Sequence, residues 1–226
     1  MNKHRIIAID GPAGSGKSST ARQLARKLNF TYLDTGAMYR CVTLAALDKG
    51  ADLSDENRIG EIASKVEIEI LPGENEDRIR LDGRDVTWKI REPKVDAGVS
   101  LVSSYKKVRR EMVRLQREFA HQKDIVAEGR DMGTVVFPHA DLKIFLVADL
   151  ETRSIRRCRQ LEAAGIETTI EEQSASLSSR DLFDSGRDNS PLMKAHGAVE
   201  IDTTDMSLNG QVEKVYELVC NKLGME

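Results

Sequence analysis

A glycine-rich segment close to the N-terminus has the residue types and the spacing that bind phosphate groups. Residues 11–18 match the pattern G-x-x-x-x-G-K-[ST]. The glycines allow the backbone to wrap closely with its N–H groups pointing inward, and the positive end of a following helix adds attraction. Lys17 can reach the outer phosphates, and the hydroxyl of Ser18 can ligate Mg²⁺. The segment predicts a nucleoside triphosphate site made of Gly11, Pro12, Ala13, Gly14, Ser15, Gly16, Lys17, Ser18 and Ser19.

Arginines are the second group of residues whose side chains could bind a ligand or take part in a reaction. Arg130 follows a predicted strand, at the end of the sheet where open parallel sheets place their ligands, and Arg40 follows Asp34-Thr35-Gly36. A guanidinium makes paired bonds to phosphate oxygens and keeps its charge, so converging arginines suit a second phosphorylated ligand. A solvated surface charge is the alternative for any single arginine. Further candidates in the later half of the chain are Arg153, Arg156, Arg157, Arg159, Arg180 and Arg187.

The elements that must position these residues follow from the apolar pattern. Short apolar runs predict strands, and apolar residues at helical spacing predict helices at 18–28 and around positions 108–119 and 212–223. Strands that alternate with helices favour parallel pairing with right-handed crossovers, so we expect an α/β fold. The predicted strands are residues 6–9, 31–33, 125–127, 144–147 and 199–201.

One segment departs from this rhythm. Val66, Ile68 and Ile70 alternate with glutamates, which is the period-two pattern of a half-exposed strand. The pair Asp82-Gly83 after Ile79 and Leu81 is a strong signal for a hairpin turn. We interpret residues 62–91 as a small antiparallel insertion.

Composition restricts the class of protein. The chain has 226 residues with 40% hydrophobic and 31% charged residues, which is enough apolar material for a core and excludes a wholly disordered chain. A net charge of -3 argues against a globally basic nucleic-acid binder. No apolar run is long enough to span a bilayer, and the N-terminal apolar run is too short for a secretory signal. The 3 widely spaced cysteines suggest free thiols, so we expect a cytoplasmic protein.

The type of triphosphate enzyme is only partly determined by these motifs. An Asn-Lys-x-Asp motif that would recognise guanine does not occur in the sequence, which argues against a GTPase. A motor ATPase usually has a strand that ends in an aspartate serving magnesium, whereas strand 125–127 is followed by Glu128 and strand 31–33 by Asp34. Whether Asp34, Ser18 or water completes the magnesium shell stays open at this point.

Four segments together resemble the bacterial cytidylate kinases, a family of nucleoside monophosphate kinases. The likeness covers nearly the whole chain, and residues 129–138 are its longest and most specific part. It implies a P-loop NTPase fold with a five-stranded parallel sheet flanked by helices, a small insertion lobe and a mobile lid. The implied single kinase domain, 1–226, has its core at 1–40 and 92–226, a monophosphate-binding insertion at about 62–91 and a lid at about 150–190. The four segments are residues 11–19, 33–40, 129–138 and 180–192.

The resemblance also implies roles for single residues. It assigns catalysis to Lys17, Arg130, Arg153 and Arg157, with Arg156 as a further lid arginine over the ATP phosphates. It places the phosphate or sugar of CMP on Arg40, Arg130 and Arg180, and the ribose on Asp184. It surrounds the cytosine with Thr35, Ser100, Arg109, Asp131 and Arg187.

Residue chemistry agrees with this assignment of the base site. Cytosine has an amine where uracil has a carbonyl, so a carboxylate such as Asp131 would accept from cytosine and repel uracil. Arg109 can donate to the cytosine carbonyl. A buried ion pair for Asp131 and a solvated helix face for Arg109 are the structural alternatives.

Two departures from the family pattern concern rigidity and metal binding. Ser18-Ser19 stands where many members have Gly-Thr or Ser-Thr, which keeps a hydroxyl for magnesium. Between Arg180 and Arg187 the chain has Leu182-Phe183 and Ser185-Gly186 where members often carry more charge, and Gly186 could loosen how Arg187 is presented.

The resemblance implies transfer of the γ-phosphate of ATP to CMP or dCMP, with Mg²⁺ as cofactor, by a monomer that binds neither nucleic acid nor membrane. A phosphate monoester has its second pKa near ~6, so the acceptor oxygen is already largely ionised and needs no general base. Another acceptor, such as UMP or shikimate, is one alternative. A non-catalytic protein that holds RNA on its basic helix, residues 106–117, is another.

Overall fold

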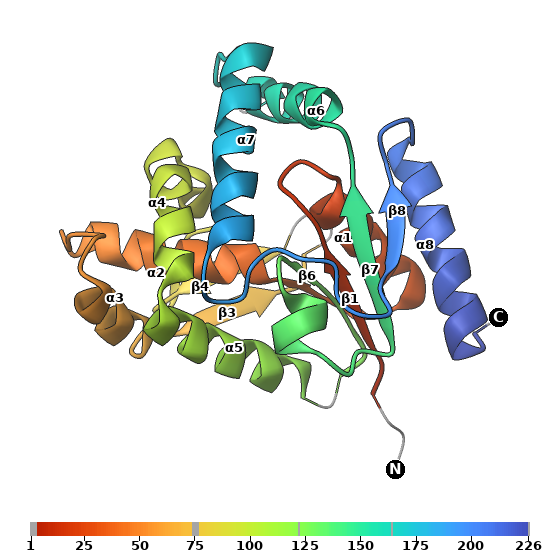
Figure 1. Ribbon diagram of the computed structural model, residues 1–226. Coiled ribbons are helices and arrows are strands. Elements are labelled where there is room, and N and C mark those ends of the chain that lie inside the picture. The colour runs from red at the N-terminus through yellow and green to blue at the C-terminus, as the bar shows by residue number, and fades with distance from the viewer. Residues whose placement is uncertain (1–3, 74–76, 122, 164, 226) are drawn as a thin grey trace. The chain divides into compact units, whose positions relative to one another are not determined.

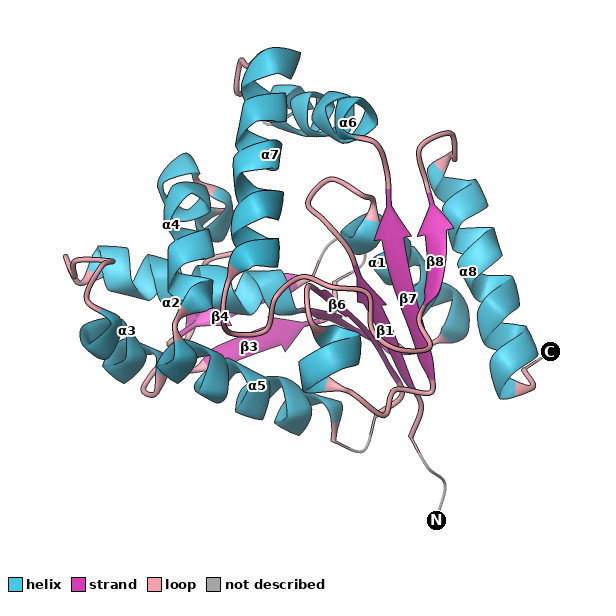
Figure 2. Cartoon of the chain, in the orientation of Figure 1, coloured by secondary structure: helices cyan, strands magenta, loops and turns pink. Residues whose placement is uncertain are grey.

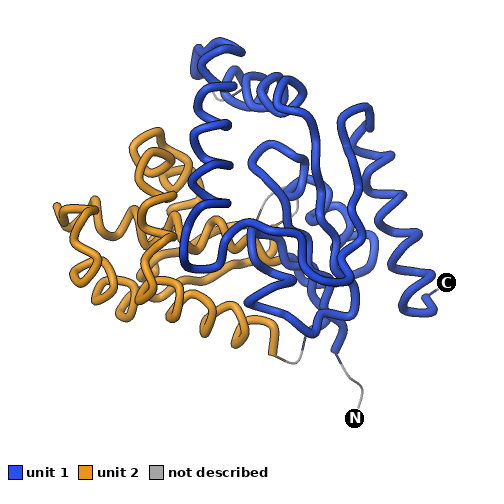
Figure 3. The backbone as a smooth tube through the Cα atoms, in the orientation of Figure 1, with its two compact units in different colours: residues 1–32, 122–226 blue, residues 33–121 orange. Residues whose placement is uncertain are grey.

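The computed structural model describes residues 4–73, 77–121, 123–163 and 165–225. These residues form two compact units, one made of the described residues before position 33 and after position 122, and the other of the described residues from 33 to 121 (Figure 3). The predicted antiparallel insertion, 62–91, lies within the second unit.

A parallel sheet with the strand order β2-β6-β1-β7-β8 forms the centre of the first unit (Figure 2). All five predicted strands are confirmed, and the apolar runs of β1 and β6 are buried as expected for central strands of a sheet covered by helices, whereas Val199 on the edge strand β8 is exposed. In the register of β1 and β6, Asp10 pairs with Gly129, so the carboxyl ends of these two strands meet. The five strands are β1 (Ile6–Asp10), β2 (Thr31–Asp34), β6 (Ile125–Gly129), β7 (Leu142–Val147) and β8 (Val199–Asp202).

Two helices cover this sheet on the apolar side. Helix α1 (Lys17–Leu28) and helix α8 (Leu208–Leu223) pack side by side (Figure 1). Their apolar residues join those of the strands in one core, in which Ile9, Leu24 and Val215 are fully buried. Burial of this kind is the main source of stability for such a layered fold.

Two further helices extend from the carboxyl side of the sheet. Helix α6 (Leu150–Ala163) follows β7 and packs against α7 (Ile170–Gly186). A capping box between Thr169 and Glu172 fixes the start of α7. A π-helical turn, η2 (Met132–Val136), follows β6.

The second unit combines helices with the antiparallel sheet that the alternating pattern predicts. The sheet has the order β3-β4-β5, and the turn between β4 and β5 has positive φ angles at Asp82 (50°) and Gly83 (76°), as a tight hairpin requires. The elements of this unit are α2 (Thr35–Asp48), α3 (Glu56–Ala63), β3 (Ile68–Leu71), β4 (Arg78–Leu81), β5 (Arg84–Asp85), η1 (Lys89–Arg91), α4 (Pro93–Ser104) and α5 (Lys106–Ala120).

In the described part of the chain, none of the helices combines the length and the apolar character needed to cross a membrane.

Candidate active site

The loop between β1 and α1 wraps in the way that the glycine pattern predicts. Gly11 has a φ of +148°, and a Cβ on it would lie 2.1 Å from the carbonyl oxygen of Leu146 on β7. Only glycine fits there, because any side chain would collide with backbone. The loop ends at Gly16, and α1 begins at Lys17, so the N-terminal end of a helix points into the loop.

Three carbonyl groups of this loop are held by side chains, and we call these contacts the carbonyl braces. Nζ of Lys17 donates to the carbonyl of Pro12 at 2.6 Å. A guanidinium nitrogen of Arg153 donates to the carbonyl of Ala13 at 3.1 Å, and Oγ1 of Thr203 to the carbonyl of Ser15 at 3.0 Å. The braces turn these carbonyl groups toward protein donors, which leaves the loop suited to present N–H groups to an anion.

The ammonium of Lys17 lies in an environment that disfavours its charge. Lys17 is 5% exposed, and burial together with the nearby charge of Arg130 lowers its pKa from 10.5 to about 7, against the opposing effect of Glu128, Asp10 and Asp184. A bound polyphosphate would supply the negative charge that favours the ammonium form. The site is therefore electrostatically suited to an anionic ligand.

A carboxylate from β6 meets the hydroxyl of the phosphate loop. Oγ of Ser18 donates to Oε1 of Glu128 at 2.6 Å, and the hydroxyl of Tyr32 donates to the same oxygen at 3.1 Å. Asp34, the other candidate, instead caps α2 by accepting from the N–H of Ala37 at 2.9 Å. Glu128 is thus the carboxylate beside Ser18, and the sequence could not decide between the two.

These oxygen donors fit a magnesium ion. Hydroxyl and carboxylate oxygens are the ligands that Mg²⁺ prefers, and Mg²⁺ usually completes its shell with water and substrate phosphates. In the described ranges, no group of three or more His, Cys, Asp or Glu side chains could hold a metal alone. A single carboxylate and a hydroxyl are consistent with an ion that arrives with a nucleotide.

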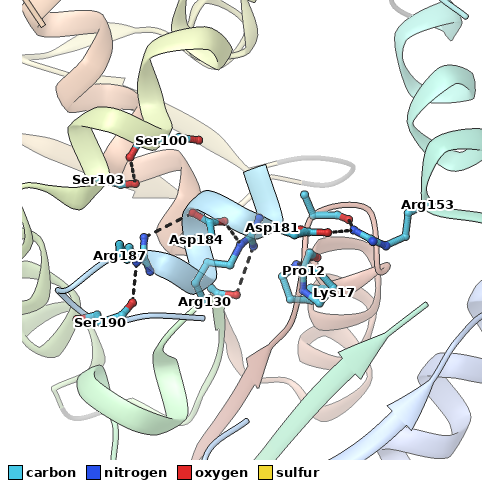
Figure 4. Close-up of polar contacts among 12 residues, drawn as sticks. Pro12, Lys17, Ser100, Ser103, Arg130, Arg153, Asp181, Asp184, Arg187 and Ser190 are labelled. Atoms are coloured by element: carbon cyan, nitrogen blue, oxygen red, sulfur yellow. Dashed lines mark hydrogen bonds and ion pairs between the residues drawn. The ribbon is translucent and has the colours of Figure 1, made fainter. Parts of the chain in front are cut away.

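Arg130, Asp184 and Arg187 are brought together beside this loop (Figure 4). Nε of Arg130 donates to Oδ2 of Asp184 at 2.9 Å, and a nitrogen of Arg187 lies 3.7 Å from Oδ1 of the same residue. Arg187 also donates to the carbonyl of Ser190 at 2.7 Å, and its side chain is 5% exposed. Arg187, next to Gly186, thus has an ion pair and a hydrogen bond in this structure.

The predicted lid arginines have three different surroundings. Arg153 donates to the carbonyl of Ala148 as well as to Ala13, and it forms a 2.5 Å ion pair with Asp181 on α7 (Figure 4). Arg156 donates to the carbonyl of Thr203 at 2.6 Å. Arg157 bonds to Gln160 on its own helix at 3.4 Å. The bond from Arg153 to Ala13 is the one of these that reaches the phosphate loop.

Asp131 and Arg180 complete the predicted residues of the first unit. Asp131 directly follows Arg130 and is 2% exposed. Arg180 is half-buried on α7, one residue before Asp181.

The remaining predicted residues lie in the second unit, on α2, α4 and α5. Thr35 is buried at the start of α2, and Ser100 is half-buried on α4. Arg40 forms a 2.5 Å ion pair with Asp96 and donates to the carbonyl of Ile90 at 3.2 Å. These contacts hold the guanidinium of Arg40 in one place.

Arg109 is buried, unlike its charged neighbours on α5. It is 5% exposed, donates to the carbonyl of Ser103 at 3.0 Å and lies over the ring of Tyr39 at 5.4 Å from the ring centre. The alternative of a solvated helix face is therefore wrong for Arg109. A buried arginine on a basic helix is a sign of a specific role.

The fold and the loop define a P-loop protein in which lysine, arginine and carboxylate side chains gather at the carboxyl ends of its parallel strands. The chain belongs to the cytidylate kinase family, because the model of that family, described as cytidylate kinase, matches residues 7–221. A cytidylate kinase of Carboxydothermus hydrogenoformans is 48% identical over 96% of this chain and 97% of its own length. A cytidylate kinase of Caldanaerobacter subterraneus subsp. tengcongensis is 49% identical over 94% of this chain and 93% of its own.

A solved structure supports the fold alone. The protein TT1252 of Thermus thermophilus is 19% identical, with a TM-score of 0.50 over 98% of this chain and 99% of that one.

Proposed function

We propose that this protein transfers the γ-phosphate of ATP to CMP or dCMP, which gives ADP and CDP or dCDP. The observation that carries the proposal is the position of Arg130, whose charge acts on Lys17 of the phosphate loop while its Nε is held by Asp184. A cation beside the triphosphate site suits an acceptor that is itself a phosphate. Membership of the cytidylate kinase family supports CMP as that acceptor.

The reaction joins two anions, so charge is its main obstacle. The acceptor oxygen of CMP is already ionised at neutral pH, since a phosphate monoester has a second pKa of about 6. Lys17 and the loop N–H groups hold the triphosphate, and Arg130 with Arg40 and Arg180 holds the acceptor phosphate. Catalysis is then alignment of two phosphates together with neutralisation of their charge.

Recognition of the base falls to buried polar residues. Asp131 accepts from the cytosine amine, and Arg109 donates to the cytosine carbonyl, with Thr35, Ser100 and Arg187 around them. Because Asp131 is 2% exposed, uracil would place its carbonyl oxygen against a buried carboxylate, which repels it. Asp184 binds the sugar.

Magnesium is the cofactor that the donor set fits. Ser18 and Glu128 would hold the ion through oxygen, and the ion would neutralise charge on the nucleotide phosphates when bound. The segment at about 150–190 acts as the lid, with Arg153 and Arg157 acting on the ATP phosphates, and the insertion at about 62–91 as the monophosphate-binding lobe. We further propose a cytoplasmic monomer that binds no nucleic acid.

A panel of acceptors tests the proposal. ADP formation from ATP is measured with CMP, dCMP, UMP, AMP and no acceptor. We expect fast turnover with CMP or dCMP, slow turnover with UMP and almost none in the last two reactions. A rate that is the same with and without CMP would contradict phosphate transfer to this acceptor.

A further inference from the structure

Asp10 is a buried carboxylate to which the transfer reaction gives no role. It ends β1, directly precedes the phosphate loop and is 2% exposed. Burial raises its pKa from 3.8 to about 6, in spite of hydrogen bonds from two backbone N–H groups that lower it. A carboxylate buried at such a position needs hydrogen-bond partners that offset the free-energy cost of its removal from water.

Both of these partners belong to the turn that follows β6. Oδ1 of Asp10 accepts from the N–H of Met132 and Oδ2 from the N–H of Gly133, each at 2.8 Å. The first N–H groups of any helical turn have no partner inside the turn. Asp131, at the cap position of η2, makes no side-chain capping hydrogen bond. Asp10 therefore caps η2 from a different strand.

The capped turn directly follows the residues that are proposed to bind the acceptor. Arg130 and Asp131 come immediately before the two capped N–H groups. Gly133 fits closely here, because a Cβ on it would lie 3.1 Å from Cβ of Ala195 and 3.4 Å from Oδ2 of Asp10. The backbone at 130–133 is thus held at a position that the carboxylate of Asp10 defines.

The phosphate loop does not depend on Asp10 in the same way. The three carbonyl braces hold it through Lys17, Arg153 and Thr203, and none of them involves Asp10. Loss of the Asp10 carboxylate would therefore loosen the backbone on the acceptor side and leave the backbone of the phosphate loop braced, while it also removes one of the charges that favour the ammonium form of Lys17.

We propose that Asp10 is a positioning residue that fixes the Arg130–Asp131 segment for the acceptor and keeps it in register with the adjoining phosphate loop. This inference rests on the proposed function, since it takes Arg130 and Asp131 to bind the acceptor. Asp10 acts through backbone N–H groups and touches no substrate.

The test compares Asp10→Asn with Asp141→Asn. Asp141 is the matched control because its Oδ2 accepts from the N–H of Ile6 at 2.9 Å, at the other end of the same strand. Asparagine keeps one acceptor oxygen and turns an amide donor toward the second N–H. Each variant is assayed for binding of a fluorescent ADP analogue and for kcat and KM with CMP.

We expect kcat/KM for CMP in Asp10→Asn to fall about 10- to 100-fold, the effect of one buried N–H left without a partner. Affinity for ADP should stay within about threefold of the wild-type value, because the three carbonyl braces that hold the phosphate loop do not involve Asp10 and are retained. Asp141→Asn should change neither quantity by more than about threefold. An equal loss of ADP affinity and CMP turnover in Asp10→Asn, or a CMP turnover equal to that of the control, would overturn the inference.

If Asp10→Asn does not fold, hydrogen exchange in the ligand-free wild-type protein tests whether Asp10 anchors the η2 turn. The N–H groups of Met132 and Gly133 should exchange as slowly as those of β6. Exchange at the rate of exposed loop N–H groups would refute the anchoring by Asp10. This measurement does not depend on the acceptor, so failure of the proposed function in the acceptor panel is distinguished from failure of this inference.

Discussion

The hydroxyl of Ser18 donates to Oε1 of Glu128 across 2.6 Å, which joins two residues that are 110 positions apart in the chain. One belongs to the phosphate loop and the other to the end of β6. Among the hydrogen bonds of the described residues, Glu128 is the carboxylate that the Ser18 hydroxyl contacts, so these two side chains are the oxygen donors of the proposed magnesium site.

Replacement of Glu128 by glutamine should therefore weaken metal binding more than nucleotide binding. We expect the affinity of Mn²⁺ for the complex with ADP to fall about tenfold, as is typical when a group that orients a metal site is lost. Electron paramagnetic resonance of bound Mn²⁺ measures this directly. Glu213→Gln is the control, since Glu213 is exposed and pairs with Lys27. Unchanged Mn²⁺ affinity in Glu128→Gln would show that Glu128 does not contribute to metal binding.

Binding of ADP should be coupled to protonation of Lys17. The pKa of Lys17 is lowered to about 7 in the ligand-free protein, so its amine is mostly neutral at pH 8 and mostly charged at pH 6. Phosphate raises this pKa, so we expect uptake of about one proton per ADP at pH 8 and much less at pH 6. Calorimetry in buffers of different ionisation enthalpy measures the uptake.

Lys17→Arg provides the control for this linkage, because a guanidinium keeps its proton over the whole range. Its uptake at pH 8 should disappear. Proton release in the wild-type protein, or the same uptake in Lys17→Arg, would show that another group titrates.

Discrimination between cytosine and uracil should depend on the charge of Asp131. In Asp131→Asn the amide can donate to the uracil carbonyl, so we expect the ratio of kcat/KM for CMP over UMP to fall at least about tenfold. Steady-state kinetics with both acceptors gives the ratio. If the ratio is unchanged while both rates fall together, Asp131 supports the structure of the site and does not recognise the base.

The close contact at Gly11 predicts a large loss of stability in Gly11→Ala. A new Cβ would lie 2.1 Å from the carbonyl oxygen of Leu146, so the free energy of unfolding should fall by about 3 kcal/mol or more. Gly197→Ala is matched in having a positive φ of +75°, but nothing lies within 4 Å of its Cβ, so only about 1 kcal/mol should be lost. Denaturant unfolding of both variants measures the difference. Equal losses would contradict a steric role for the contact.

The central strands β1 and β6 could be predicted from the sequence because each contains a short apolar run that the fold buries, and β3 and β4 because apolar and charged residues alternate in them. The helix α7 could not, since only Leu177 and Asp184 are buried among its 17 residues and no apolar stripe marks it. The candidate residues Arg180 and Asp184 on α7, and Arg187 directly after it, are indicated by arginine chemistry and by the resemblance, and not by periodicity.

The sequence patterns also could not predict which residues contact one another in the site. The run of basic residues at 106–110 predicts a solvated face, whereas the turn of α5 brings Arg109 to the buried side with Val108 and Met112. The choice of Glu128 over Asp34 beside Ser18 depends on tertiary distances, which neither motif contains. The same holds for Asp10, whose two N–H partners belong to the η2 turn, more than 120 positions further along the chain.

The central claim is that cationic groups on two sides of the site hold two phosphates for direct transfer, with Arg130 on the acceptor side. The most direct measurement supplies γ-labelled ATP to equal concentrations of CMP and UMP, with wild-type protein and with Arg130→Ala. The account predicts label almost entirely in CDP, formed at least about 100-fold more slowly by the variant. Equal labelling of CDP and UDP would contradict this claim. Release of the label as inorganic phosphate, at a rate that does not depend on CMP or UMP, would also contradict it.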